Sequence, residues 1–267
     1  MIKISVMWMT RKRSHELIYS LSSFIHNADD NANVEYIFVT DPDDEETSIA
    51  LEKIVPMADA YSAELIHIAA DKRYGYSELE QYQNLAAKNF TGDCILSYAD
   101  DNICIEKGWD TEIRKGLEER KGKPVFIAIT PINEIWKGSS TVVGINREWY
   151  ETTNRFSGNR ATDAYLCDLA AAANIKQFRP DVKILHLQRG RETAGEIIQN
   201  GVKRAVWGLP GEDDFGGYNA KNPIPPKYYH NPDEFQEPKT DFVEGKRRFD
   251  DDLIKLKEYY EKILTNN

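Results

Sequence analysis

The sequence predicts an α/β fold: an open, mostly parallel, twisted sheet with helices on both faces, then a Pro-rich loop and a C-terminal helix. Apolar runs of strand length alternate with segments of helical period, which is typical of βαβ units. The first run, residues 2–9, is apolar almost throughout, as expected of a strand covered on both faces. The expected strands are 2–9, 34–39, 63–68, 94–98, 125–130, 141–145 and 182–187.

The helices are predicted from apolar spacing and from residues suited to helix ends. Ser14 stands where the first helix would be capped. Ser77 and Glu80 form a capping box for a helix that runs to about Lys88. The expected helices contain residues 17–25, 47–57, 77–88, 109–119, 162–173 and 242–264.

The composition changes after Trp207. Residues 208–238 contain six of the eleven prolines, which predicts a loop rather than a folding unit. The last helix carries an apolar stripe that would dock on the body of the protein or on a second copy in a homo-oligomer: Phe249, Leu253, Leu256, Tyr260 and Ile263. We therefore expect a main domain at 1–207, a Pro/Gly-rich loop at 208–241 and a C-terminal helix at 242–267.

The composition is that of an acidic globular protein. Its 267 residues include 34 Lys and Arg against 44 Asp and Glu, a net charge of −10, which disfavours general binding to nucleic acids or anionic membranes. No apolar run approaches the roughly 20 residues of a membrane span, and residues 1–13 do not resemble a signal peptide. The three cysteines form no CxxC motif. We expect a cytoplasmic protein.

Polar residues follow four of the predicted strands: Thr10, Asp41, the pair Asp100 and Asp101, and His186. In an open α/β sheet, ligands bind at the carboxyl ends of the strands where the strand order reverses. Adjacent carboxylates there suit Mg²⁺ or Mn²⁺ with substrate phosphates, and a histidine ligand favours Mn²⁺. The alternatives are an acidic turn for the pair, a turn role for Asp41 and a hydrogen-bonded structural role for His186.

Basic residues surround the same sheet edge and could give an acidic protein a positive site for a diphosphate, although each could also be ordinary surface. They lie at 11–13 and 72–73, and at Arg189 and Arg191. Asp163 stands in the first turn of its helix, where the helix dipole keeps it ionised and able to act as a base, or where it is simply a favourable residue. Trp136, Trp149, Tyr150 and Phe156 could stack on a sugar or a base, or belong to the core.

The order of these motifs resembles that of family 2-type glycosyltransferases with the GT-A fold. The resemblance covers about residues 2–190 and rests on seven segments: the first strand with its polar turn, the second strand ending at Asp41, residues 75–86, the stretch 91–96, the pair Asp100 and Asp101, and the two later motifs at Asp163 and His186. It implies that Asp41 contacts the base and Asp100 the ribose. It also implies that Asp101 and His186 hold the cation, and that Asp163, with Asp168 as a rival, deprotonates the acceptor. The expected donor-binding residues are Thr10, Arg13, Asp41, Arg73, Asp100, Arg189 and Arg191.

The resemblance implies a transferase that moves a sugar, with inversion, from a nucleotide-diphosphate donor to a hydroxyl acceptor with Mn²⁺ or Mg²⁺. A UDP-sugar is the favoured donor. The acceptor stays open between a glycan, a lipid-linked sugar, a protein and a modified DNA base. One alternative is a nucleotidyltransferase, although residues 10–14 lack the glycine that its loop favours. The other alternative is a non-catalytic binding or assembly protein on the same fold.

Overall fold

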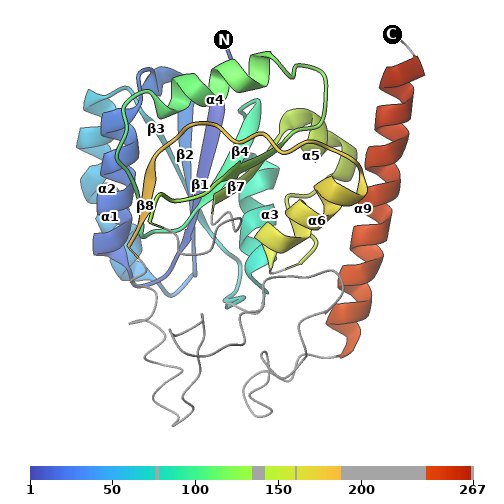
Figure 1. The fold of residues 1–267 in the computed structure, drawn as a ribbon. Helices are drawn as coiled ribbons and strands as arrows, with labels where there is room; N and C mark the ends of the chain where they lie inside the picture. The colour runs from blue at the N-terminus through green and yellow to red at the C-terminus, as the bar shows by residue number, and fades with distance from the viewer. Residues whose placement is uncertain (76–77, 134–141, 160, 188–238, 266–267) are drawn as a thin grey trace. The chain divides into compact units, whose positions relative to one another are not determined.

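The computed structural model describes residues 1–75, 78–133, 142–159, 161–187 and 239–265. Residues 1–186 and 245–267 form one compact unit, and 187–244 are grouped apart from it. The main sheet has six strands in the order β3-β2-β1-β4-β7-β6 (Figure 1). They are β1 (Ile4–Thr10), β2 (Val34–Thr40), β3 (Glu64–Ala69), β4 (Cys94–Tyr98), β6 (Phe126–Ile129) and β7 (Val142–Asn146).

The sheet is mostly parallel, as predicted. β1 pairs in parallel with β2 and β4, β2 pairs in parallel with β3, and β7 runs antiparallel between β4 and β6. The chain builds outward from β1 through β2 to β3, and then returns to place β4 on the other side of β1. The order of strands therefore reverses between β1 and β4, and this is where an open α/β sheet binds its ligands.

Helices cover both faces of the sheet and enclose two apolar layers. One layer is formed with α1 (Ser14–Asn27), α2 (Glu45–Ala60) and α4 (Trp109–Glu118). The other is formed with α3 (Leu79–Asn89), α5 (Arg147–Thr153), α6 (Thr162–Ala172) and α9 (Lys239–Thr265). Neighbouring β1 residues point to opposite layers, Trp8 to the first and Met7 to the second. Both side chains are fully buried, which explains the uninterrupted apolar run.

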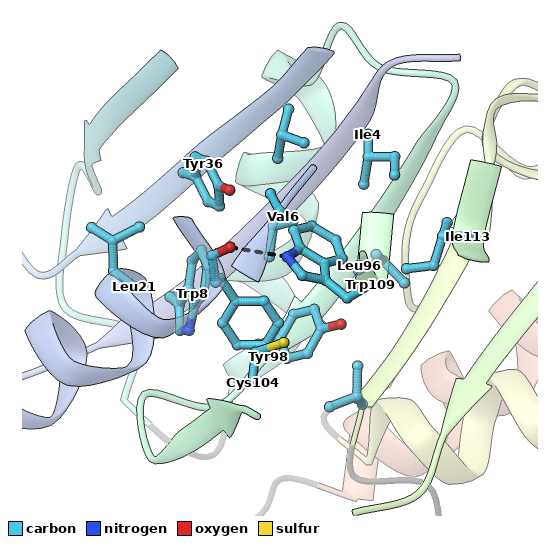
Figure 2. Close-up of a cluster of buried hydrophobic side chains, with 14 of the residues drawn as sticks. Ile4, Val6, Trp8, Leu21, Tyr36, Leu96, Tyr98, Cys104, Trp109 and Ile113 are labelled. Atoms are coloured by element: carbon cyan, nitrogen blue, oxygen red, sulfur yellow. Dashed lines mark hydrogen bonds between the residues drawn. The ribbon is translucent and has the colours of Figure 1, made fainter. Parts of the chain in front are cut away.

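The first layer contains a group of aromatic side chains in contact with one another (Figure 2). The Trp8 ring stacks on the rings of Phe38 and Tyr98, with centroids 5.4 Å and 5.9 Å away. Its indole nitrogen donates to Ser20 Oγ on α1 at 3.0 Å. Trp109 Nε1 donates to the Phe24 carbonyl at 2.9 Å. Both buried indole N–H groups are thus satisfied while their rings fill the core.

The structure corrects two details of the sequence-based expectation and decides a third that was left open between two roles. Ser14 does not cap α1: the helix has Arg13 at its N-cap without a side-chain cap bond, and Ser14 Oγ donates to Glu46 at 2.7 Å. The strand β5 (Asn102–Cys104) and the helix α5 were not predicted. Trp149 and Phe156 are core residues, because both are fully buried in the second layer. Ser77 and Trp136 lie outside the described residues.

The apolar stripe of the last helix docks on the body of the protein. Leu256 is fully buried in the second layer, and Phe249, Leu253 and Tyr260 pack against that layer. The carboxylate of Asp252 on this helix is buried and makes polar contacts with the body of the protein. Tyr165 OH donates to it at 2.6 Å and Arg155 Nε lies 3.3 Å from it. Among the helices that the structure describes, none is long and apolar enough to cross a membrane.

Replacing Leu256 by Ala should lower the stability of the protein by about 2–5 kcal/mol, because it removes a buried side chain and leaves a cavity. Ile254→Ala is the matched control: this neighbour is 56% exposed, so its loss should cost much less. Chemical denaturation of both variants measures the difference. Equal losses would show that α9 does not pack on the body through Leu256.

Candidate functional site at the carboxyl ends of β1 and β4

The first group of polar side chains lies at the point where the strand order reverses. β4 ends opposite Trp8 of β1, so the turn after β4 arrives beside Thr10. Thr10 Oγ1 donates to Asp100 Oδ2 at 3.0 Å, and the Arg13 guanidinium forms a salt bridge with the other oxygen of Asp100. Asp100 is only 4% exposed. Burial raises the pKa of its carboxyl to about 6, against the opposing effect of Arg13.

A tight turn presents both carboxylates. Asn102 N donates to the Ala99 carbonyl at 3.0 Å, and Asn102 Oδ1 accepts from Ala99 N at 2.9 Å. The two aspartates occupy the positions between Ala99 and Asn102. The acidic turn that was the alternative interpretation of the pair is therefore also present. Asp101 is 3% exposed and lies 3.5 Å from Arg13 Nη2. The turn therefore holds two buried carboxylates against one guanidinium.

His186 reaches the same place through a small second sheet. β5 pairs antiparallel with β8 (Ile184–His186), and the register sets His186 opposite Asn102. His186 Nε2 consequently lies 3.4 Å from Asp101 Oδ1. Asn133 fixes the backbone of His186 from both sides, because its amide accepts from the His186 N–H at 2.9 Å and donates to the carbonyl at 2.8 Å. Side chains 85 residues apart are thereby held together.

A second group surrounds Asp41 at the end of β2. β1 and β2 end in register, Thr10 opposite Thr40, so Arg11 and Asp41 emerge side by side. Arg11 Nη1 lies 2.7 Å from Asp41 Oδ2 and 2.6 Å from Asp43 Oδ1. Arg73 is more distant, with Nε 4.0 Å from Asp41 Oδ2. Asp41 is thus a buried carboxylate with two arginine side chains beside it.

The hydroxyl of Tyr82 on α3 also donates to Asp41. The same oxygen accepts the N–H groups of Tyr74 and Gly75, at 2.8 Å and 3.0 Å. Gly75 has a φ of +72°, a conformation that favours glycine. Tyr82 therefore joins Asp41 to the loop that follows β3.

Asp163 lies in the first turn of α6 and is an exposed residue, but the protein packed around its carboxyl raises the pKa above the ordinary value, so the expectation that the helix start favours its ionised form is wrong. The start of this helix is tied to β4: Thr162 Oγ1 donates to Gln83, whose amide donates to Ser97 Oγ at 3.3 Å. In the described part of the chain, no hydrogen bond or ion pair joins Asp163 to the carboxylate pair. Its role as a base therefore stays a prediction. The two late arginines of the expected donor set, Arg189 and Arg191, lie outside the described residues.

Three contributing residues were absent from the sequence-based set. Arg11 was noted only as part of the basic segment 11–13, although a parallel pairing of the first two strands would have placed it beside Asp41. Tyr82 and Asn133 carried no sequence signal, because each acts through a contact that only the folded chain creates.

The residues present suit a divalent cation that is bound partly by the protein and partly by a substrate. Among the described residues, no group of three or more His, Cys, Asp or Glu side chains could hold a metal by itself. Mg²⁺ and Mn²⁺, however, commonly take one or two protein ligands and complete their shell with phosphate oxygens and water. His186 Nε2 and Asp101 Oδ1 are 3.4 Å apart. This distance is close to the roughly 3 Å that separates adjacent ligand atoms of an octahedral ion with bonds of about 2.1 Å.

No protein-family model matches the sequence, and no curated protein matches it. Solved structures match its fold. S. aureus TarS 1–349 has a TM-score of 0.52 at 15% identity, over 65% of this chain and 56% of that one. The mannosyltransferase PcManGT from Pyrobaculum calidifontis, in complex with GDP-Man and Mn²⁺, has a TM-score of 0.53 at 15% identity, over 74% and 61%. The chain thus spans less than two thirds of the length of either protein.

These similarities confirm the predicted fold, an α/β sheet arranged as in GT-A glycosyltransferases. TarS 1–349 has also been solved with UDP, and that structure matches over 64% of this chain with a TM-score of 0.52. At 15% identity the likeness defines the class of fold, while the chemistry depends on the residues of this chain.

Replacing Asp100 by Asn should make the protein more stable at neutral pH. Because the pKa of Asp100 in the folded protein is about 6, above its ordinary value, this carboxylate lowers stability as the pH rises from about 4 to above 6. Asp100→Asn should therefore raise the Tm at pH 7.5 by roughly 2–6 °C without divalent cations, and the gain should vanish near pH 4.

Asp43→Asn is the control with the opposite sign. Its hydrogen bond with Arg11 lowers the pKa of the Asp43 carboxyl to about 2, so the charge is favoured and its removal should give no gain. Thermal melts of both variants from pH 4 to pH 8 test the contrast. A D100N protein no more stable than wild type at pH 7.5 would show that the buried charge carries no net cost.

Proposed function

We propose that this protein is a cation-dependent glycosyltransferase that moves a sugar, with inversion, from a nucleotide-diphosphate donor to a hydroxyl group. One observation carries the proposal: two buried carboxylates and a histidine meet where the strand order reverses, with Asp101 and His186 3.4 Å apart. Neighbours with the same fold support it, since their structures contain UDP, UDP-GlcNAc, or GDP-Man with Mn²⁺. A UDP-sugar remains the favoured donor.

The donor would lie across the two groups of side chains. Asp41, with Arg73 beside it, is assigned to the base, and Asp100 to the ribose. Asp101 and His186 are assigned to the cation, which would act as a Lewis acid and neutralise the charge that develops on the leaving diphosphate. The shared register of β1, β2 and β4 supports this assignment, because it brings both groups to one sheet edge.

The chain's own contribution to the transfer is to orient the donor and to accept a proton. In an inverting transfer, the acceptor oxygen bonds to the anomeric carbon from the face opposite the diphosphate, and the bond from that carbon to the diphosphate oxygen breaks. The acceptor proton passes to Asp163, and the nucleoside diphosphate leaves. The exposed position of the Asp163 side chain suits contact with an acceptor. The acceptor itself stays open between a glycan, a lipid-linked sugar, a protein and a modified DNA base.

Asp101→Asn should lower the release of nucleoside diphosphate from the donor by about 10²-fold or more, because a weakened cation site loses several kcal/mol of leaving-group stabilisation. The assay supplies UDP-, GDP-, CDP- and dTDP-sugars with Mn²⁺ and detects the released nucleotide. Asp181→Asn, an exposed carboxylate near the start of β8, should leave the rate unchanged. Undiminished turnover in D101N would exclude Asp101 as the cation ligand.

The same assay separates the alternatives. Release of pyrophosphate would indicate a nucleotidyltransferase. A bound nucleoside diphosphate at 100 times its Kd should stabilise the protein by about 2.7 kcal/mol. If UDP, GDP, CDP and dTDP with Mn²⁺ all leave the Tm unmoved, the alternative of a non-catalytic protein on this fold is favoured.

Asp163→Asn should reduce kcat for transfer to an acceptor by about 10²–10⁴-fold with little change in the Kd of the donor, as expected for loss of a general base. Asp168→Asn is the matched control on the same helix, since it removes a carboxylate of similar type one turn further along. Single-turnover kinetics with the acceptor found by screening provide the measurement. A larger loss in D168N than in D163N would reassign the base to Asp168.

A further inference from the structure

The hydroxyl of Tyr82 on α3 uses its full hydrogen-bonding capacity. A phenol has one O–H donor and two acceptor lone pairs. In Tyr82 the O–H donates to Asp41 Oδ1, and the oxygen accepts the N–H groups of Tyr74 and Gly75 at 2.8 Å and 3.0 Å. The residue is only 6% exposed. Burial and the bond to Asp41 raise the pKa of Tyr82 to about 12, so the hydroxyl keeps its proton at neutral pH.

On one side, this hydroxyl fixes the carboxylate of Asp41. Tyr82 donates to one carboxylate oxygen, and Nη1 of Arg11, which also contacts Asp43, lies 2.7 Å from the other. Because each oxygen has its own donor, the carboxylate cannot rotate without breaking one of these bonds. A carboxylate oxygen has two lone pairs, so Asp41 can still accept an N–H group from a bound base. Its acceptor sites therefore point in a set direction.

On the other side, the hydroxyl holds the segment that follows β3. The N–H groups of Tyr74 and Gly75 donate to it, and the Tyr74 ring packs edge-on against the Tyr82 ring with centroids 5.2 Å apart. Gly75 has a φ of +72°, so the turn that aims these N–H groups uses a conformation that favours glycine. Arg73 directly precedes them, and its Nε lies 4.0 Å from Asp41 Oδ2. Tyr82 thus keeps Arg73 near the same carboxylate that it orients.

We propose that Tyr82 is a positioning residue for the nucleoside of the donor: its hydroxyl holds the Asp41 carboxylate and the segment 71–75 in the geometry that receives the base. This rests on the proposed function, because it requires that Asp41 contacts the base. Groups already held in their binding geometry lose less conformational entropy when the ligand arrives. Tyr82 acts through Asp41 and Arg73, so it contributes to affinity for the nucleotide rather than to the rate of bond breaking.

Tyr82→Phe removes the hydroxyl and keeps the ring. Calorimetry with saturating Mn²⁺ should show binding about tenfold weaker than in wild type for whichever of UDP, GDP, CDP and dTDP binds wild type most tightly. The KM for the matching sugar donor should rise by a similar factor, while kcat for release of the nucleoside diphosphate stays within about twofold. A purely structural loss would lower the Tm without this split between KM and kcat.

Tyr165→Phe is the matched control. Tyr165 is also a buried tyrosine whose hydroxyl donates to a carboxylate, that of Asp252, at 2.6 Å. This pair joins α6 to α9 and belongs to neither group of the candidate site. Y165F should therefore lower the Tm to an extent comparable with Y82F and leave the nucleotide affinity within about twofold of wild type.

A second matched pair tests the segment rather than the hydroxyl. Gly75 and Gly122 have φ of +72° and +74°, and at both a Cβ would meet no atom of the described chain within 4 Å. Alanine at either position therefore introduces the same backbone strain without a clash. Gly75→Ala should weaken nucleotide binding by about threefold or more, because relief of the strain moves its N–H away from Tyr82. Gly122→Ala, in the turn after α4, should leave the affinity unchanged.

The outcomes separate this inference from the function on which it rests. If wild type binds a nucleotide with Mn²⁺ and Y82F binds it equally well, Tyr82 does not position the nucleoside and the proposed function stands. An equal loss of affinity in Y165F would overturn the inference as well, since stability alone would then explain the effect. G75A with wild-type affinity overturns the role of the segment, and it decides the inference where Y82F fails to fold. If wild type binds none of UDP, GDP, CDP and dTDP with Mn²⁺, both proposals fall.

Discussion

The common register of three parallel strands is the constraint on which the rest of the structure depends. Ile4 of β1 is opposite Val34 of β2 on one side and Cys94 of β4 on the other. The three strands therefore start level and finish at one edge of the sheet. A slip of one residue would turn every β1 side chain to the opposite layer. The contacts of Thr10 with Asp100 and of Arg11 with Asp41 both follow from this alignment.

The register is fixed at the opposite, amino ends of the same strands. The fully buried carboxylate of Glu35 on β2 accepts from Ser5 Oγ on β1 at 2.6 Å and from the Thr91 N–H ahead of β4 at 2.6 Å. A Cβ on Gly92 would lie 2.5 Å from Ser5 Oγ and 2.9 Å from the Lys3 carbonyl, so only glycine allows the chain this close. The carboxylate of Glu35 thus connects β1, β2 and the start of β4 at their amino ends, away from the candidate site.

The sequence predicted what is encoded locally. The bounds of β4 are those expected, and the Asp100 and Asp101 pair was found because it directly follows that apolar strand. His186 was found for the same reason, but its approach to Asp101 depends on the pairing of β5 with β8, and β5 is only three residues long. Tyr82 and Asn133 were missed because their contacts cross 41 and 53 residues of chain and have no local pattern. Sequence patterns thus located strand ends, and tertiary packing decided which side chains meet there.

Two buried carboxylates, Glu35 and Asp100, lie at the opposite ends of these strands and differ in the direction of their pKa shifts. Burial opposes ionisation of both. For Glu35, hydrogen bonds from Ser5, Thr91 and Lys3 outweigh burial, and its pKa lies below the ordinary value. For Asp100, Thr10 and Arg13 do not outweigh burial and the adjacent charge of Asp101, and its pKa is raised to about 6. The ionised form of Glu35 is therefore favoured at the amino ends of the strands, whereas the ionised form of Asp100 is disfavoured at their carboxyl ends. Shifted pKa values gather at functional sites, so the raised pKa of Asp100 favours the carboxyl ends of these strands as the place of the proposed site.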